Sequence, residues 1–445
     1  MSKKIFIKTF GCQMNEYDSN RILDLVKTID YSLTTNLAES DCYVLNTCHI
    51  REKATEKVFH DIGRVKKNFR NKKKPILIVT GCVAQAEGEE LLKKENYIDG
   101  VVGPQSYHDI PGIIKRAEIK KNKFNSTDFN TIEKFDHLKI IKNSNSKVSS
   151  YLTIQEGCDK FCHFCVVPYT RGPEFSRSFS EIILEAKQLV NNGSKEITLL
   201  GQNVNAYKYD KYKLSDLINK LNNIKGLERI RYTTSHPRDV SDDLMDAHRD
   251  CDKLMPLLHL PVQSGSDKIL KAMNRKHNIE YYLNIVEKLK KKNKLLKFSS
   301  DFIIGYPGET SHDFKETIDL VKKVKFINSY SFIYSVRPGT PASNLIIPDL
   351  SLSKKRLEEF QKISNEIKNS YRKNILNNKV KVLFENKIKN ENLYFGRDEH
   401  HNSVIVKSEI DLVGKINDVE INNFNRNTLF GDIILISNKK KVIAA

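Results

Sequence analysis

The stretch EGCDKFCHFCVVPYTRG, residues 156–172, decides how this chain is interpreted, because it places three cysteines within eight residues. Cys158, Cys162 and Cys165 have the spacing C-x3-C-x2-C. Three thiolates this close together can hold one face of a [4Fe–4S] cluster, since such clusters are bound by cysteine thiolates. Three protein ligands leave one iron without a protein ligand, and a substrate or cofactor can bind there.

Two other interpretations of these cysteines compete with a cluster. Structural zinc requires a closed set of four ligands, and His163 is the one nearby candidate for the fourth. His163 is flanked by two of the thiolates, however, and could hardly reach the same ion. Three unrelated core cysteines are the remaining alternative. We take the iron–sulfur cluster as the prediction.

The region that follows the cysteines predicts a barrel or partial barrel. The motif directly follows the strand-like run YLTIQE, and five more apolar runs follow it with helical stretches between them. Repeated βα units place an active site at the carboxyl ends of the strands, so the cysteines would lie at the mouth of the barrel. The six runs are 151–156, 196–202, 229–235, 256–263, 298–305 and 329–336.

The first part of the chain, to about residue 115, alternates short β-branched runs with helix-like patterns, which is typical of a doubly wound parallel sheet. Cys12, Cys48 and Cys82 each directly follow one of its predicted strands, in TFGC, LNTC and VTGC. Strand carboxyl ends share one edge of a parallel sheet, so these cysteines are expected to converge. Two cysteine triplets suggest two clusters, with chance placement as the alternative. Cys42 and Cys251 fit neither triplet and are taken as structural.

The remaining segments define the expected domain bounds. Residues 119–143 are Lys/Asn/Ser-rich with weak periodicity and predict a linker. Leu357, Phe360, Ile363, Ile367, Tyr371 and Ile375 have helical spacing and predict an amphipathic helix packed on the core. Short alternating runs after residue 379 predict a small all-β barrel. The predicted domains are 1–118, 144–374 and 377–440.

Bulk composition narrows the class of protein. The chain has 445 residues, 39% hydrophobic and 29% charged, and no run approaches the roughly 18 apolar residues of a membrane helix. Its first residues resemble a strand and not a signal peptide, so a cytoplasmic protein is expected. A net charge of +19 favours a polyanionic partner such as RNA, although a general Lys/Asn/Ile bias is an alternative explanation. Eight cysteines exclude a disulfide scaffold.

Several long motifs resemble the methylthiotransferase family, and within it the MiaB-type tRNA enzymes. KTFGCQMNEYDS, NTCHIREKATEKVFHDIGR and VTGCVAQAEG are similar to the N-terminal domain of that family. EGCDKFCHFCVVPYTRGPEFSR, TTSHPRDV, HLPVQSGSDKILKAMNR and DFIIGYPGET resemble its radical S-adenosylmethionine domain, and YFGRD with LFGDII resembles its TRAM domain. The small departures, such as His49 after Cys48 and the HF pair before Cys165, alter no ligand.

The resemblance implies a radical S-adenosylmethionine enzyme with two [4Fe–4S] clusters. Cys158, Cys162 and Cys165 would hold the cluster that binds S-adenosylmethionine, and Cys12, Cys48 and Cys82 an auxiliary cluster that carries or donates sulfur. The implied reaction adds a methylthio group to C2 of N6-isopentenyladenosine at position 37 of the tRNA anticodon loop. LLGQNVNAY and IREKA argue against threonylcarbamoyl-adenosine or a ribosomal-protein aspartate as the substrate. A non-catalytic RNA-binding protein with structural metal is the alternative from another class.

Further site residues and partners carry over from the same resemblance. Tyr394, Phe395 and Arg397 could contact RNA, with core aromatics as the alternative for the two rings. A tRNA substrate, an external flavodoxin-like electron donor, a sulfur source, a monomeric state and no membrane are expected. The predicted S-adenosylmethionine pocket, for which plain loop polarity and turn glycines are the alternatives, comprises Phe164, Gln202, Asn203, Ser235, Gln263, Ser264, Asp301 and Gly305.

Overall fold

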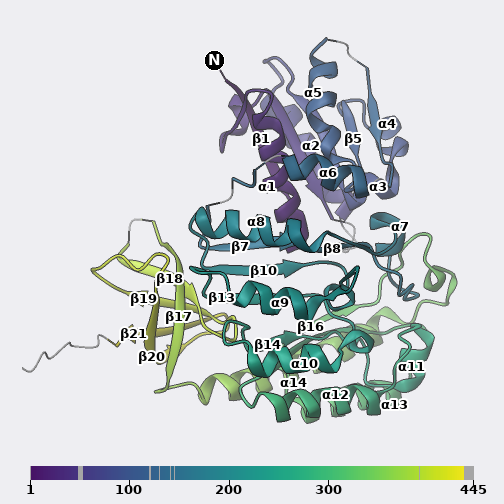
Figure 1. The fold of residues 1–445 in the computed structure, drawn as a ribbon. Coiled ribbons are helices and arrows are strands. Elements are labelled where there is room, and N and C mark those ends of the chain that lie inside the picture. The colour runs from purple at the N-terminus through teal and green to yellow at the C-terminus, as the bar shows by residue number, and fades with distance from the viewer. Residues whose placement is uncertain are drawn as a thin grey trace, which may run out of the picture.

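The computed structural model describes residues 2–48, 54–119, 122–129, 131–140, 142–144, 146–389 and 391–434. These residues form an N-terminal parallel sheet, a central open barrel and a small C-terminal closed barrel (Figure 1). The predicted α/β fold class is confirmed. The IREKA segment, apart from Ala54, lies outside the described residues, as does the end of the predicted tail domain.

The N-terminal sheet has six parallel strands in the order β2-β1-β3-β4-β5-β6. Helices α1, α5 and α6 pack on one face, and α2, α3 and α4 pack on the other. The residues of β3 alternate between these two cores, as a strand buried on both faces must. The elements are β1 Lys3–Thr9, β2 Tyr31–Leu33, β3 Cys42–Thr47, β4 Ile76–Gly81, β5 Gly100–Val102, β6 Phe124–Ser126, α1 Gln13–Lys27, α2 Ala54–Asn68, α3 Cys82–Glu87, α4 Glu89–Lys94, α5 Ile110–Ile119 and α6 Thr131–Ile140.

The segment predicted as a linker differs from that expectation, because β6 and α6 both lie within residues 119–143. Strand β6 pairs with β5 and completes the sheet. Helix α6 buries Phe135 and Leu138 in the same core as α1 and α5. The periodicity of residues 119–143 is weak for two reasons. The strand β6 has only three residues, and few side chains of α6 face the core.

The central unit contains the six predicted strands as two parallel three-stranded groups, β7-β10-β13 and β14-β15-β16. A bridge between Ile230 and Leu254 joins the groups. Among the described residues β7 and β16 do not pair with each other, so the barrel stays open. The strands are β7 Ser149–Thr153, β10 Glu196–Leu200, β13 Arg229–Tyr232, β14 Leu257–His259, β15 Lys297–Ile304 and β16 Asn328–Ile333.

Helices pack outside these strands around one large apolar core. The predicted amphipathic helix is α14, which ends two residues earlier than its pattern suggested, so Ile375 packs against the tail barrel instead. Phe360 of α14 meets Phe302 of β15 with 4.8 Å between ring centroids. The main helices are α8 Phe179–Asn191, α9 Leu214–Asn222, α10 Asp242–Asp250, α11 Asp267–Ala272, α12 Ile279–Lys292, α13 Ser311–Val324 and α14 Leu350–Lys373.

The tail forms a closed barrel of five strands in the order β17-β18-β19-β21-β20. Arg229 donates to the carbonyl oxygens of Arg397 and Lys381, each at 2.8 Å, and Arg231 donates to those of Glu399 and Asp398. The tail barrel therefore docks at the amino ends of the central strands (Figure 1). Its strands are β17 Lys379–Lys387, β18 Leu393–Arg397, β19 Ser403–Lys407, β20 Ile416–Phe424 and β21 Thr428–Ile433. No helix in the described parts of the chain has both the length and the apolar character to cross a membrane.

Replacing Arg229 with Ala should loosen the docked tail. The change leaves the carbonyls of Arg397 and Lys381 without their charged donor, and each such bond contributes about 1.5–3 kcal/mol. Hydrogen exchange should then speed up selectively in β17 and β18. Lys381→Ala is the matched control, because it removes a positive charge from the docked strand β17 but keeps the carbonyl that accepts from Arg229. Equal exchange in both variants would contradict this account of the docking.

Candidate active site

The loop with Cys158, Cys162 and Cys165 is fixed in place by the elements around it. The amide of Gly157 donates to Gln202 Oε1 at 2.7 Å, just after β10. The amide of His163 donates to Met273 O at 3.1 Å, at the end of α11. The loop leads into α7, Val167–Arg171. The cysteines therefore lie beyond the carboxyl ends of the central strands, where catalysis occurs in barrels of this kind.

The three thiols of this loop differ in their surroundings. Burial raises the pKa of Cys158 to about 12 and that of Cys165 to about 12. Cys162 Sγ accepts a hydrogen bond of 3.5 Å from Arg275 Nη1. Thiols of this kind bind iron only as thiolates, so binding a cluster would release protons. Buried and partly buried thiols with a guanidinium nearby fit an anionic iron–sulfur group, whose sulfurs accept such hydrogen bonds.

The second triplet comes together at the carboxyl edge of the N-terminal sheet. Cys12, Cys48 and Cys82 follow β1, β3 and β4, which are neighbours in the sheet. The strand ends approach so closely that only glycine fits before two of the cysteines. A Cβ on Gly11, at φ +116°, would lie 2.4 Å from Cys48 Cβ, and one on Gly81, at φ +92°, would lie 2.2 Å from Thr47 O.

Cys12 has a lowered pKa. A hydrogen bond from Cys48 and the charge of Arg171 outweigh the desolvation of the thiol and lower the pKa of Cys12 to about 6. Cys12 is exposed, whereas Cys48 and Cys82 are buried. Two buried thiols and one acidic thiol at a single sheet edge are suited to a metal cluster.

A buried ionic network connects the two triplets. Arg171, the last residue of α7, forms an ion pair with Asp18 of α1 at 2.9 Å and lies 3.6 Å from a carboxylate oxygen of Glu156. Lys134 of α6 holds the other oxygen of Glu156. Burial alone would raise the pKa of Glu156, but Lys134 and Arg171 hold it below its usual range. The loop of the first triplet is thus tied to the sheet that carries the second.

Part of the predicted cofactor pocket is well placed to bind a polar small molecule. Asn203 is buried and donates to Asp239 at 2.8 Å, yet its Oδ1 has no hydrogen-bond partner among the described residues. The same holds for Ser235 Oγ and for His236 Nε2. Buried polar atoms without partners are costly, so a ligand with matching donors and acceptors would stabilise this region. The residues present fit the polar groups of S-adenosylmethionine.

The other predicted pocket residues have varied surroundings. Asp301 Oδ2 lies 3.4 Å from His259 Nε2. The backbone N–H of Gln263, a residue with φ +80°, donates to the backbone oxygen of Asp301. Phe164 packs against an apolar cluster that includes Tyr306 and Met273.

Two of the predicted pocket residues contact helices instead. Ser264 Oγ is 3.3 Å from Thr317 Oγ1 on α13. Gly305 makes room for α14, because a Cβ there would lie 2.3 Å from Ser353 Oγ.

The structure also brings in residues that the sequence did not single out. Lys160 forms an ion pair of 2.8 Å with Asp239, and Arg275 contacts Cys162. Phe161 and Tyr169 are large aromatic residues that stay 52% and 44% exposed beside the cysteines. The position of Lys160 and Phe161 inside the C-x3-C gap was a usable signal. Arg275 ends the quoted motif HLPVQSGSDKILKAMNR, but no local pattern linked it to a cysteine 113 residues away.

The three predicted RNA contacts of the tail lie in different environments. Tyr394 is only 3% exposed and packs in the core of the tail barrel. Phe395 and Arg397 are half-buried, with the guanidinium 5.3 Å from the ring centroid and an ion pair of 3.2 Å to Glu385. The tail barrel docks at the end of the central strands opposite the cysteine loop (Figure 1).

An open parallel barrel with a three-cysteine loop at its carboxyl end defines the radical S-adenosylmethionine class. The Radical SAM superfamily model matches residues 152–321, and the model of the uncharacterized protein family UPF0004 matches residues 4–103. A radical S-adenosylmethionine methyltransferase from Kitasatospora setae shares the fold, with a TM-score of 0.57, 11% identity and 77% of each chain covered. A cobalamin-dependent radical enzyme has a TM-score of 0.51 and 12% identity, over 82% of this chain and 57% of its own.

Relatives with much higher identity bear the name tRNA-2-methylthio-N(6)-dimethylallyladenosine synthase. One from Pelagibacter ubique is 60% identical, over 99% of this chain and all of its own. Others from Rickettsia canadensis and Cereibacter sphaeroides are each 47% identical, over 97% of this chain. The chain belongs to this family of tRNA methylthiotransferases. The predicted resemblance is confirmed, and membership implies a [4Fe–4S] cluster, S-adenosylmethionine and a tRNA substrate.

Alkylation of the iron-free protein should single out Cys12. With a pKa near 6, its thiol is mostly thiolate at pH 7 and loses reactivity below pH 6, while Cys158 and Cys165 still gain reactivity above pH 9. Iodoacetamide labelling at several pH values, read by peptide mass spectrometry, measures each rate. In Cys48→Ala the half-maximal pH of Cys12 should rise toward about 8.5, the value of a free cysteine. A wild-type value already above 8 would contradict the proposed hydrogen bond.

Proposed function

We propose that this protein adds a methylthio group to C2 of N6-isopentenyladenosine at position 37 of the tRNA anticodon loop. The product would be 2-methylthio-N6-isopentenyladenosine. The observation that carries the proposal is the pairing of two cysteine triplets, each at the carboxyl edge of its own set of parallel strands, with Arg171 between them. A simple radical enzyme needs one such triplet, whereas sulfur insertion also needs a site that supplies sulfur.

The first triplet, Cys158, Cys162 and Cys165, would hold the cluster that binds S-adenosylmethionine. When bound, these groups supply a radical able to remove hydrogen from an unactivated aromatic C–H bond, which acid–base groups cannot do. The protein's part is to orient and shield. Asn203, Ser235 and His236 would contact the polar groups of S-adenosylmethionine, since Asn203 Oδ1, Ser235 Oγ and His236 Nε2 have no hydrogen-bond partner among the described residues.

The second triplet, Cys12, Cys48 and Cys82, would hold an auxiliary [4Fe–4S] cluster that carries the sulfur. Arg171 supports this proposal, because its buried positive charge acts on both Cys12 and Cys82. A cation beside three thiolates offsets their mutual repulsion. The remaining residues of the network, Asp18 and Glu156, hold the guanidinium in position.

The substrate base must leave its stack to reach the cysteines, and an unpaired loop base does so cheaply. We assign the flanking nucleotides to Phe161 and Tyr169, which lie exposed beside the cysteine loop with 6.5 Å between their rings. Phe395 and Arg397 of the tail would contact a more distant part of the tRNA, and Tyr394 would support them from the core.

The reaction also sets requirements for partners. Reductive cleavage of S-adenosylmethionine consumes an electron, so we propose an external flavodoxin-like donor. The inserted sulfur must be replaced after each turnover, which requires a sulfur source. One S-adenosylmethionine would supply the radical, and a second would supply the methyl group. We further propose that the protein works as a cytoplasmic monomer, where tRNA is available.

Nucleoside mass spectrometry of tRNA from a host without its own enzyme tests the proposed reaction. Expression of this protein should produce 2-methylthio-N6-isopentenyladenosine. Cys162→Ala should abolish S-adenosylmethionine cleavage, whereas Cys12→Ala should keep cleavage and stop thiolation. Cys251→Ser is the matched control, because Cys251 belongs to neither triplet and serine keeps a donor for Asn219. Thiolation by the Cys12 variant would refute the proposal that Cys12 holds an auxiliary cluster. Detection of a different modified nucleoside would show that the protein acts on another substrate.

Binding of tRNA should depend on both charge and stacking. Affinity should fall steeply with salt, as expected when phosphates are neutralised by basic side chains. Tyr169→Ala should weaken binding by about 1–3 kcal/mol at every salt concentration, the usual contribution of one stacked base. Leu295→Ala is the control, since it removes an exposed apolar side chain, 66% exposed, near the docked tail. A flat salt response, or equal affinities of the two variants, would contradict this interface.

A further inference from the structure

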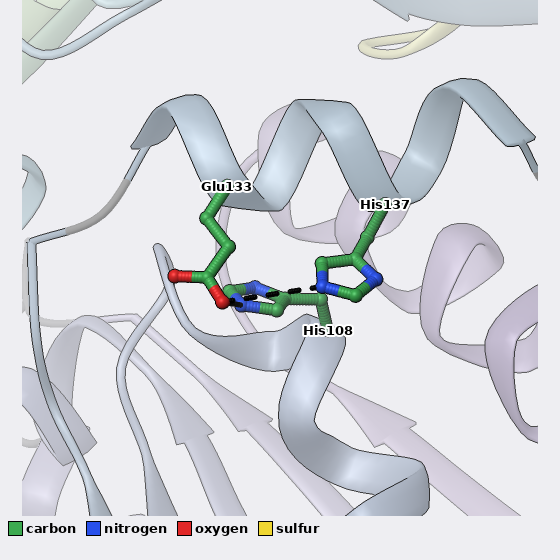
Figure 2. Close-up of side chains that lie close together, drawn as sticks. All are labelled: His108, Glu133 and His137. Carbon is green, nitrogen blue, oxygen red and sulfur yellow. Dashed lines mark ion pairs between the residues drawn. The ribbon is translucent and has the colours of Figure 1, made fainter.

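We propose that His108, Glu133 and His137 form a binding site for a divalent transition-metal ion, with Zn²⁺ as the best match. Figure 2 shows Glu133 and His137 reaching from one face of α6 toward His108. The two α6 residues are four positions apart, so their side chains are neighbours on that face. His108 belongs to the 3-10 turn Tyr107–Asp109 that precedes α5. The site is separate from both cysteine triplets and does not depend on the proposed reaction.

The distances among the three ligand atoms suit a metal ion. Glu133 Oε1 lies 3.9 Å from His108 Nε2 and 4.0 Å from His137 Nε2, and all three atoms fall within 4.8 Å of one another. Zinc bonds of 2.0–2.2 Å in a tetrahedral site put ligand atoms about 3.3 Å apart. Reaching that spacing requires shifts of about 0.6–1.5 Å, which the half-exposed side chains of Glu133 and His137 can make. Water would take the fourth position.

The chemistry of the three donors is selective. Imidazole nitrogen with one carboxylate suits zinc and similar borderline metals, whereas Mg²⁺ and Ca²⁺ prefer oxygen alone. The nearest further ligand is Asp109, whose Oδ1 lies 3.7 Å from His108 Nε2. Neutral imidazole is the form that binds a metal ion.

The three side chains gather around a buried imidazole. Glu133 Oε1 lies 3.9 Å from His108 Nε2, which is too long for a hydrogen bond. The ring is also costly to bury, because its side chain is 4% exposed and its Nδ1 has no hydrogen-bond partner among the described residues. The His108 and His137 rings stack with 5.0 Å between centroids. A shared metal ion accounts for the buried imidazole, the stacking and the nearby carboxylate together.

A metal ion here would clamp α6 to the N-terminal unit. The residue after Glu133 is Lys134, which holds Glu156 at the start of the cysteine loop. The next, Phe135, stacks on Phe175 of the central unit at 5.7 Å. A metal ion bound to Glu133 and His137 would hold both ends of the helical turn that carries Lys134 and Phe135. It would thereby fix the contacts of these two residues with the central unit. The expected effect is therefore a higher stability of the junction.

The test uses iron–sulfur-loaded protein, kept without oxygen, treated with a chelator and then given Zn²⁺ alone. Gel filtration with metal analysis should show one retained zinc per chain, and X-ray absorption at the zinc edge should show nitrogen and oxygen ligands. Zinc should also raise the melting temperature. His137→Ala, a change at an exposed residue, should weaken zinc binding at least about tenfold and abolish the temperature shift.

His60→Ala is the matched control, because His60 is an exposed histidine on α2, away from the three ligands. It should bind zinc as tightly as the wild type. Glu133→Gln should give an intermediate loss, since the amide oxygen is a weaker ligand. Sulfur ligands in the absorption spectrum, no retained zinc, or equal affinities of the His137 and His60 variants would each overturn the proposal.

Discussion

Four buried charges, Asp18, Lys134, Glu156 and Arg171, hold the parts of this molecule in one arrangement. They come from α1, α6, the two-residue strand β8, Gln155–Glu156, and α7, so each belongs to a different segment of the chain. Removing one partner of a buried ion pair costs about 3–5 kcal/mol, because a charge is left without compensation in a medium that cannot solvate it. Glu156 precedes the cysteine loop and Arg171 ends it. The network therefore fixes both ends of the loop against the N-terminal sheet.

The open barrel makes such a fixed arrangement necessary. Its edge strand β7 is covered by α1, where Met14 and Tyr17 pack against Leu200 and Tyr151, and Thr153 donates to Met14 Sδ at 3.1 Å. The N-terminal unit thus protects an edge that would otherwise present unpaired backbone groups. At the amino ends of the strands, Arg229 and Arg231 anchor the tail barrel through backbone carbonyls. The carboxyl ends carry the cysteine loop, so the docked tail and the cysteine loop lie at opposite ends of the strands.

Each cysteine triplet has its own guanidinium. Arg275 donates to Cys162, and the charge of Arg171 acts on Cys12 and Cys82. A group held by three thiolates is anionic, and a fixed cation with hydrogen-bond donors stabilises it and tunes its potential. The two arginines differ in their support, since Arg171 is held by two carboxylates and Arg275 by the carbonyl of Pro261. Similar chemistry at the two sites thus rests on different packing.

The sequence by itself determined whatever depends on neighbouring residues. The spacing of Cys158, Cys162 and Cys165, the strands that precede Cys12, Cys48 and Cys82, and the three-part fold were all visible as local patterns. Tertiary structure alone decided which distant residues meet. Arg171 and Asp18 are 153 positions apart, and Arg229 bonds to a carbonyl 168 positions away. The strand β6 and the helix α6, both within residues 119–143, are stabilised by pairing with β5 and by packing in the core of the N-terminal sheet. The periodicity of a segment indicates which of its side chains face a core. An ion pair between distant segments exists only after the chain has folded, so no local sequence pattern predicts it.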